Sequence, residues 1–157
     1  MDEIDSKILH ILSENANATA TEMMAQINLS IPAINKRISK LRQSGMIRQF
    51  TILVDPEKVG KPIQAFILVV LQHPSCATAL AEYIQSDPDI LECYAVTGEY
   101  DYIIKVCAAD VEQLEKKLLL LKHQKGVAKS HTMLSLMEHK FRPCILPDPT
   151  VKYKEEL

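Results

Sequence analysis

The 157-residue chain contains no tryptophan, and aromatic residues make up only 5% of it. Proteins that bind single-stranded nucleic acid stack bases on aromatic side chains, so this composition disfavours that class. No apolar run is long enough to span a bilayer, and the acidic, amphipathic start MDEIDSKIL lacks the pattern of a signal peptide. Neither a GxSxG nucleophile motif nor a phosphate-binding glycine loop is present, which argues against an enzyme with catalytic residues of these kinds.

Cysteine is scattered rather than clustered. The four cysteines form no CxxC pair: Cys76, Cys93, Cys107 and Cys144. This spacing favours neither a metal cluster nor a disulfide framework, and it fits a reducing cytoplasm. We therefore expect a cytoplasmic protein with no metal site and no cofactor. A hydrophobic content of 47% is typical of a globular protein with one domain or two small ones.

Residues 19–45, TATEMMAQINLSIPAINKRISKLRQSG, predict two short helices joined by a tight turn. Thr19 and Glu22 have the spacing of a capping box at the start of the first helix. Ser30 is a suitable N-cap for the second helix, and Pro32 fits its first turn because no intrahelical N–H is needed there. Gly45 lies where a left-handed residue ends a helix. With an amphipathic helix at residues 5–13, these elements predict a helix-turn-helix domain whose last helix enters a DNA major groove.

The second of these helices is basic. The whole chain has 18 basic and 20 acidic residues, yet no acid interrupts residues 36–48, which include Lys36, Arg37, Lys40, Arg42 and Arg48. Such residues contact DNA phosphates, although a merely solvated helix face has a similar composition. Asn35 and Lys36 lie near the helix start, from which base edges are read. Either side chain could instead contact a phosphate or only water.

The remainder predicts a hinge and a second domain. Residues 47–54 are rich in β-forming residues and predict a strand that forms a small wing or a bridge. The glycine and prolines of residues 55–63 predict a hinge. Residues 64–141 alternate strand, helix, strand, strand, helix and strand, the pattern of a ferredoxin-like βαββαβ sheet with both helices on one face. The predicted fold is therefore α+β, with a winged helix-turn-helix domain at 1–54 and an extended or disordered tail at 142–157.

The first strand of this second domain, at residues 65–71, is apolar on both faces. Helices cover only one face of such a sheet, so something else must cover the other. A second copy related by a two-fold axis is the simplest cover. Two paired helix-turn-helix units can then reach successive major grooves about 34 Å apart. The alternative is a monomer with a tolerated apolar surface.

Four segments resemble the Lrp/AsnC (feast/famine) regulators of bacteria and archaea: IDSKIL, LSIPAINKRISKLRQSGMI, DPEKVG and AVTGEYDYIIKV. The resemblance extends from Ile4 to about Lys140, and the last segment is the most specific. It implies a transcriptional regulator that binds double-stranded DNA and dimerises through its C-terminal module. It also implies assembly into tetramers or octamers and an amino acid, or a related small molecule, bound between dimers.

By position, the resemblance implies two sets of site residues. The recognition-helix region contains Ser30, Ile31, Pro32, Ala33, Asn35, Lys36, Arg37 and Lys40. The effector loop contains Gly98, Glu99, Tyr100 and Asp101, and the last strand contributes Thr132, Leu134 and Leu136. Asp101 can take an ammonium group, and Gly98 leaves backbone N–H groups open to a carboxylate. The same loop residues also suit a plain hairpin turn, and the strand residues suit a sheet core.

One departure from the family pattern concerns the start of the recognition helix. Many members begin it with Ser-Pro, whereas here Ile31 separates Ser30 from Pro32. The proline still falls in the first turn, but the base-reading side chains could be displaced. The operator sequence therefore cannot be inferred from the helix.

Two rival functions are also compatible with the sequence. Haem-pathway decarboxylases of the sirohaem type share the two-part architecture, and they would need a basic pocket with histidines for a tetrapyrrole. His131 and His139 have an even spacing on the predicted last strand, but neither has a second motif nearby. The other rival is an effector-binding assembly module without DNA binding, and the basic helix argues against it.

Overall fold

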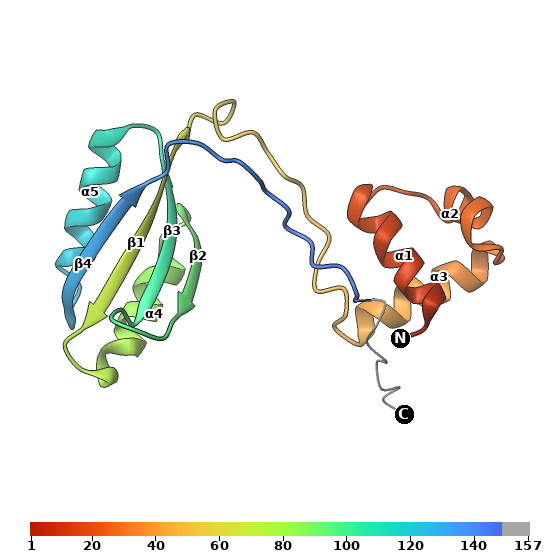
Figure 1. Cartoon of the computed structure of the whole chain (residues 1–157), viewed down its shortest axis with the longest axis horizontal. Coiled ribbons are helices and arrows are strands. Elements are labelled where there is room, and N and C mark those ends of the chain that lie inside the picture. Colours follow the sequence, from red (N-terminus) through yellow and green to blue (C-terminus); the bar gives the residue numbers. More distant parts are fainter. Residues whose placement is uncertain (149–157) are drawn as a thin grey trace. The chain divides into compact units, whose positions relative to one another are not determined.

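The computed structural model describes residues 1–148, which divide into two compact units (Figure 1). Met1–Leu53 and the segment that begins at Lys140 form one unit, and Val54–His139 form the other. We call them the head and the sheet unit. Residues 142–148 of the predicted tail form no helix or strand, whereas residues 149–157 lie outside the described part of the chain.

Three helices form the head: α1 (Glu3–Glu14), α2 (Ala20–Ile27) and α3 (Ile31–Gln43). Their apolar faces meet in one small core, whose buried residues are Ile8, Met23, Ile27, Ile34 and Leu41. Helix α1 begins earlier than its apolar periodicity indicates, because Asp2 and Asp5 form a capping box. The Asp5 N–H donates to Oδ1 of Asp2 over 2.8 Å, and the Asp2 N–H donates to Oδ2 of Asp5 over 3.1 Å.

Local sequence signals also mark the ends of α2 and α3. At α2, Oε2 of Glu22 accepts from the Thr19 N–H at 2.7 Å, and the Thr19 hydroxyl accepts from the Glu22 N–H at 3.2 Å. This confirms the predicted capping box. Ser30 is the N-cap of α3, as predicted, but its side chain accepts no capping hydrogen bond. Pro32 has no N–H, so one of the two usual donors to a cap is missing. Gly45 has a φ of +74° just beyond the end of α3, as predicted.

The expected wing strand at residues 47–54 is not present, because this segment forms no strand in the structure. Its apolar side chains are instead exposed, with Ile52 at 81% and Leu53 at 62%. A β-strand needs a neighbouring strand to satisfy its backbone N–H and C=O groups. The composition of a strand is therefore not sufficient to form one here.

The sheet unit has the predicted βαββαβ order. Its elements are β1 (Ile63–Leu71), the short η1 (Pro74–Cys76), α4 (Ala77–Ser86), β2 (Ile90–Ala95), β3 (Tyr102–Ala108), α5 (Val111–Lys122) and β4 (Val127–Leu134). The strand order is β2-β3-β1-β4, and every neighbouring pair is antiparallel. This arrangement confirms the ferredoxin-like fold.

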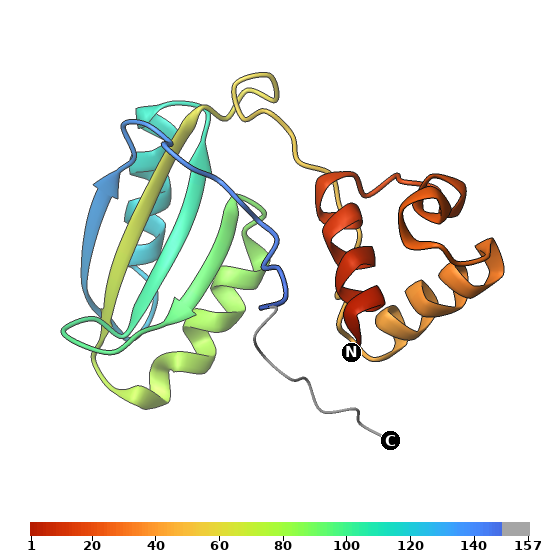
Figure 2. The same cartoon turned by 45° about the vertical axis from the view of Figure 1, so that its right-hand side comes forward.

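Both helices cover the same face of this sheet (Figures 1 and 2). On β1, Ala65, Ile67 and Val69 are buried against helix residues that include Leu80 and Leu121. The alternate residues of β1 point to the other face, which the helices leave open. These are Gln64, Phe66, Leu68 and Val70, and all four are only half-buried. Because β1 is apolar on both faces and the helices cover only one of them, this open face is the uncovered apolar surface that the sequence predicts.

Strand β4 ends before His139, so the expectation that His131 and His139 lie on one strand is wrong. Leu134 is opposite Ala65, and the last bond runs from the Ser135 N–H to the Gln64 carbonyl over 2.9 Å. Strand β1 begins at Ile63, directly after a proline that has no N–H to donate. Gln64 and Ile63 of β1 continue to pair with β3 beyond this point, so β1 extends further than β4.

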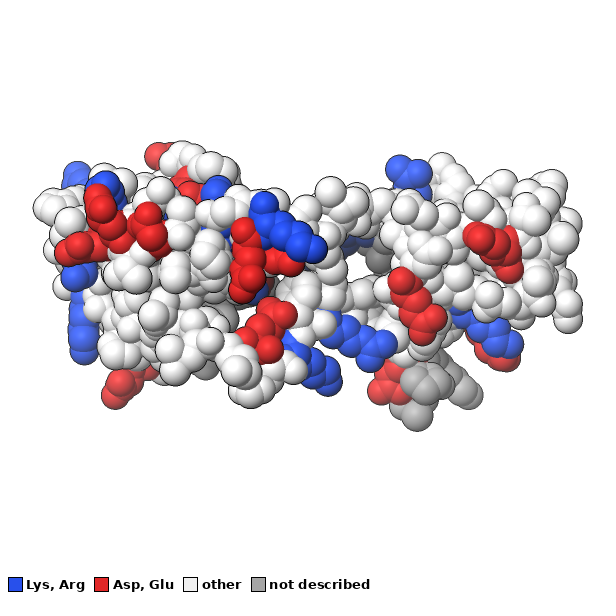
Figure 3. Space-filling model, turned by 90° about the horizontal axis from the view of Figure 1, so that it is seen from above, with Lys and Arg blue, Asp and Glu red and all other residues white. Residues whose placement is uncertain are grey.

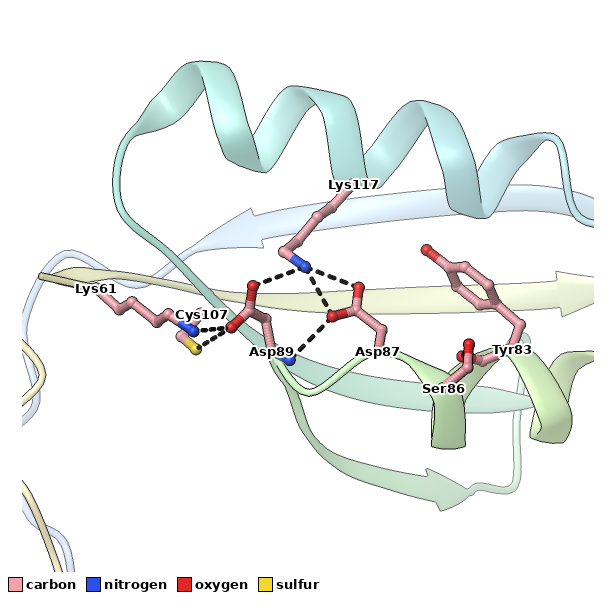
Figure 4. A network of polar contacts seen from close by, with 7 residues as sticks. All are labelled: Lys61, Tyr83, Ser86, Asp87, Asp89, Cys107 and Lys117. Carbon is pink, nitrogen blue, oxygen red and sulfur yellow. Dashed lines mark hydrogen bonds and ion pairs between the residues drawn. The ribbon is translucent and has the colours of Figure 1, made fainter. Parts of the chain in front are cut away.

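An ion-pair network holds the start of β1 to the rest of the sheet unit (Figure 4). Lys61 donates to Oδ1 of Asp89. Lys117 of α5 contacts both Oδ atoms of Asp87 at 2.8 Å and Oδ2 of Asp89 at 2.9 Å. The hydrogen bond from Lys61, followed by that from Lys117, lowers the pKa of Asp89. Burial works against the charge of Lys117, but its bonds to the two aspartates outweigh burial and raise its pKa.

The Cys107 thiol lies beside this network, with its Sγ atom 3.9 Å from Oδ1 of Asp89. Burial first, and then the negative charge of Asp89, raise the pKa of this thiol. A raised pKa keeps a thiol protonated and unreactive at neutral pH. Cys107 therefore acts as a structural side chain of the sheet unit.

Candidate nucleic-acid interface and effector loop

Helix α3 divides its side chains between the head core and solvent. Ile34 is completely buried and Leu41 nearly so, while Ala33 and Ile38 are half-buried. The predicted contact residues that α3 or its N-cap leaves exposed are Ser30, Ile31, Pro32, Asn35, Lys36 and Lys40. Side chains spaced by three or four residues share one helix face. Lys36 and Lys40 are four residues apart and thus share one solvent-facing side of the helix, while Asn35 is exposed on the neighbouring side. A major-groove reader requires exposed polar side chains of this kind.

Arg37 differs from the other predicted contact residues, because the head itself binds its guanidinium group. Its Nη1 atom lies 2.7 Å from Oδ2 of Asp2 and 2.7 Å from Oδ1 of Asp5. These bonds, to Asp5 first and then to Asp2, raise the pKa of Arg37. The guanidinium therefore joins the N-terminus of α1 to α3, and the charge block at residues 36–48 overstates the positive charge offered to DNA.

The other cations of the block are not paired in this way. Within residues 1–148, no ion pair with a carboxylate joins the remaining members: Lys36, Lys40, Arg42 and Arg48. In contrast, several acidic and basic side chains lie next to one another on the visible face of the sheet unit, whereas most of the remaining visible surface carries no charge (Figure 3). Unpaired surface cations are available to neutralise the phosphates of a polyanion such as DNA.

Two arginines near the C-terminal end of α3 were not among the predicted site residues. Arg42 and Arg48 are exposed and line a groove of about 630 Å³ between α3 and the segment that follows it. The C ζ atom of Arg42 lies 5.7 Å from the centroid of the Phe50 ring. The charge block in the sequence includes both arginines, but only the folded chain shows that they share a groove.

The predicted effector loop connects β2 to β3, and Asp101 stabilises it from within. Its Oδ2 atom accepts from the Leu71 N–H over 2.7 Å, and its own N–H donates to the Val69 carbonyl over 2.9 Å. The loop closes on itself through the Val96 N–H, which donates to the Asp101 carbonyl over 2.9 Å. Asp101 thus joins the loop to the end of β1 and has a clear structural role.

The other loop residues are open to solvent or nearly so. Gly98 has a φ of +114°, a conformation that side chains rarely adopt, and a Cβ atom there would meet nothing within 4 Å. Glu99 is exposed, and the Tyr100 ring is half-buried with Nζ of Lys129 at 6.0 Å from its centroid. The loop therefore combines a backbone that only glycine permits readily with an accessible carboxylate and an aromatic ring.

A cleft of about 270 Å³ adjoins this loop. Asp101 and Tyr102 line it together with residues at the end of β1 and the start of α4, among them His73 and Ala77. The remaining predicted loop residues, at positions 98–100, do not line it. The cleft is thus a partial match to the predicted effector site.

The predicted residues of the last strand lie elsewhere in the sheet. Thr132 is opposite Ile67 and Leu134 is opposite Ala65, so both are on the helix-covered face. Tyr102, beside the loop, is opposite Val69, which is four residues and roughly 13 Å along β1 from Ala65. Leu136 lies beyond β4 and is 92% exposed. Within a single chain, Leu134 is therefore remote from the loop, and Thr132 lies one strand away from β3 and two residues along β1 from Val69.

Residues 1–148 contain neither a cluster of metal-binding side chains nor a membrane-spanning helix. No group of three or more histidine, cysteine, aspartate or glutamate residues in this range could hold a metal ion. None of the described helices has both the length and the apolar character needed to cross a membrane.

A helix-turn-helix head and a ferredoxin-like sheet unit define a class of two-part DNA-binding regulators. Residues 1–48 match the family model described as winged helix-turn-helix DNA-binding, and residues 64–145 match that of the Lrp/AsnC ligand binding domain. The chain belongs to the Lrp/AsnC family of transcriptional regulators, as the four resembling segments indicate.

Individual relatives agree with this assignment. The HTH-type transcriptional regulator FL11 of Pyrococcus horikoshii is 39% identical over 143 residues, which cover 89% of this chain and 92% of that protein. Transcriptional regulator NMB0573 of Neisseria meningitidis, solved as a complex with L-Met, has a TM-score of 0.88 and 30% identity. The match covers 92% of this chain and 96% of that one. For AsnC of Escherichia coli the TM-score is 0.85 at 26% identity, with coverage of 92% and 97%.

Proposed function

We propose that this regulator acts in the prokaryotic cytoplasm as a homodimer, and that the dimers assemble further into tetramers or octamers. In this proposal, α3 contacts operator DNA and the sheet unit binds an amino acid or a related small molecule. The observation that carries the proposal is the exposed side of α3 on which Lys36 and Lys40 lie together, without a carboxylate partner among residues 1–148 and with Asn35 exposed beside them. Asn35 suits an adenine edge and the lysines suit guanine or phosphate.

The open face of the sheet supports the proposed dimer. Phe66 and Leu68 of β1 are flanked there by Ile103 of β3 and Met133 of β4, which the register places on the same face. Tyr94 of β2 extends this apolar surface and is 57% exposed. The register also places two polar residues on this face, Lys105 opposite Phe66 and His131 opposite Leu68, and Lys105 is paired with Glu92. Apolar side chains left open among polar ones are typical of an interface between two chains. A second copy covers this face with the same residues, as a two-fold axis requires.

The loop between β2 and β3 supports the proposed effector site. Asp101 uses Oδ2 for the Leu71 N–H, and no bond to its Oδ1 is present among residues 1–148, so Oδ1 remains available to an ammonium group. The open backbone around Gly98 suits a carboxylate. The L-Met bound to the Neisseria relative is consistent with an amino acid here. Thr132, Leu134 and Leu136 would then complete the site only from a neighbouring chain.

Salt-dependent retardation of promoter DNA tests the DNA-binding part. We expect affinity to fall steeply as salt rises, because cations on the protein displace counterions from DNA. Replacing Lys36 and Lys40 together by alanine should weaken binding on every sequence. Lys7→Ala serves as the control, because Lys7 is an exposed lysine of the head that pairs with Glu3 at 2.9 Å. Absence of binding at low salt would contradict the proposal and leave the assembly module as the better function.

A thermal-shift screen of the amino acids tests the effector part. A ligand that binds only the folded protein raises its apparent stability in proportion to the logarithm of its concentration. We expect one or a few amino acids to do so. Absorbance after mixing with sirohaem tests the decarboxylase alternative in the same samples, and a tetrapyrrole that binds and is turned over would replace the regulator as the favoured function.

A further inference from the structure

The groove beside α3 has the composition of an anion site. Its floor contains Ile38 and Ile47, which are half-buried and pack against the head core. Asn35 contributes to its α3 wall, and Arg42 and Arg48 are its charged lining residues. Residues 31–54 contain no aspartate or glutamate, so no acid from this stretch lines the groove. Two guanidinium groups near each other without a carboxylate attract an anion.

The Phe50 ring contacts the guanidinium group of Arg42 but leaves the N–H donors of that group available. The C ζ atom of Arg42 lies 5.7 Å from the ring centroid, within the range of a cation–π contact. This attraction involves the ring face and occupies none of the guanidinium N–H donors. An arginine held against a ring also loses less conformational freedom when it binds a ligand. Phe50 thus orients Arg42 without neutralising it.

The shape of the groove favours a polymer over a small molecule. A pocket for a small ligand usually buries most of the ligand surface. Here Arg42, Arg48 and the Phe50 ring are all exposed, with Phe50 at 43%. Asn35 both lines the groove and lies on the exposed face of α3, so the groove is continuous with the surface assigned to DNA. A sugar-phosphate strand can follow the groove while bases meet the start of α3.

We propose that this groove binds the sugar-phosphate backbone of one DNA strand, with Arg42 and Arg48 on its phosphates and Phe50 orienting Arg42. The inference rests on the proposed DNA binding and adds a phosphate site that takes the place of Arg37. Arg37 belongs to the predicted contact residues, but its guanidinium is bound to Asp2 and Asp5. In this proposal, Arg37 stabilises the fold of the head, whereas Arg42 and Arg48 bind DNA.

The test measures the affinity of the full chain for a mixed-sequence DNA duplex by fluorescence anisotropy across a series of salt concentrations. Each phosphate contact contributes about 0.9 to the slope of log affinity against log salt. Arg42→Gln and Arg48→Gln should each reduce that slope by about one for every bound chain. Lys7→Gln removes a positive charge from α1 of the same head and should leave the slope unchanged. Circular dichroism of each variant confirms that its helices remain folded.

Phe50→Leu separates orientation from charge. The leucine keeps an apolar side chain against the groove but removes the ring face. We expect affinity to fall about two- to fivefold with the salt slope unchanged, because the number of charges is the same. A second duplex of unrelated sequence should show the same losses for all three variants, since phosphate contacts carry no base information.

The outcomes distinguish the two proposals. If the unmodified chain binds DNA and both arginine variants keep the wild-type slope of log affinity against log salt, the proposed phosphate-binding groove is overturned. The proposed function as a DNA-binding regulator is then unaffected. No binding by the unmodified chain overturns both. Losses confined to one of the two duplexes would assign the arginines to base reading and would also overturn the groove as a backbone site.

Discussion

The basic block of the head and three lysines of the sheet unit differ in whether they have a carboxylate partner. In the sheet unit, Lys61, Lys105 and Lys117 each lie beside a carboxylate of the same unit. In the head, Arg37 is paired, but Lys36, Lys40, Arg42 and Arg48 have no carboxylate partner within residues 1–148. The sheet unit instead leaves an apolar face open. Unpaired cations suit a polyanion and an open apolar face suits a second protein surface, so each unit indicates its own partner.

The largest expected effect comes from placing a charge on the open sheet face. Leu68→Lys should give a monomer by light scattering, because a lysine in an apolar interface loses its hydration without a partner. DNA affinity should fall by about 100-fold or more, since two linked heads bind more tightly than one. Leu119→Lys makes the same change on α5, where the leucine is 47% exposed, and should leave the dimer intact. A Leu68→Lys protein that remains dimeric would contradict the proposed role of this face.

A smaller effect separates the paired cation of the head from an unpaired one. Arg37→Met leaves Asp2 and Asp5 without their partner and should destabilise the head by about 1 kcal/mol in chemical denaturation. The slope of DNA affinity against salt should not change. Lys40→Met is the matched substitution, and it should lower that slope while stability stays the same. If Arg37→Met reduces the slope as Lys40→Met does, Arg37 also contacts DNA.

Asp101 allows the structural role of the loop to be separated from ligand binding. Asp101→Ala removes the acceptor for the Leu71 N–H and should cost up to about 1 kcal/mol of stability. Asp101→Asn keeps an acceptor oxygen but loses the charge that would bind an ammonium group. We expect Asp101→Asn to lose the amino-acid thermal shift and keep the wild-type melting temperature. A normal amino-acid response in Asp101→Asn would show that the carboxylate serves the loop alone.

The smallest effect concerns the pH dependence of the sheet unit. The pKa of Asp89 is lower in the folded state than in the unfolded chain, whose value is about 3.9. Its contribution to stability is therefore present above that value and is lost as pH falls through the folded pKa. Lys61 and Lys117 have raised pKa values, so their contribution is lost only as pH rises above about 10.4. Asp89→Asn should reduce the acid-induced loss of melting temperature by a few degrees, whereas Glu99→Gln on the exposed loop should not.

Predictability from the sequence followed the range of the interactions. The capping box of Thr19 and Glu22 spans three residues and was predicted correctly. Residues 47–54 have the composition of a strand but form none, because a strand depends on a neighbour as well as on its own residues. Likewise, β4 ends at Leu134, so His139 lies outside the strand although its even spacing from His131 suits one. The individual DNA and effector contacts remain predictions.

The sequence by itself determined the helix-turn-helix head, the βαββαβ order of the sheet unit and the family. Periodicity, caps and turn residues act over a few positions, and the four resembling segments are continuous in the chain. Only the tertiary structure decided which charges are free. Arg37 meets carboxylates 32 and 35 residues away, and Asp101 meets an N–H 30 residues away. Such pairs form only when distant elements pack together, so a block of basic residues shows where positive charge lies but not which part of it DNA can reach.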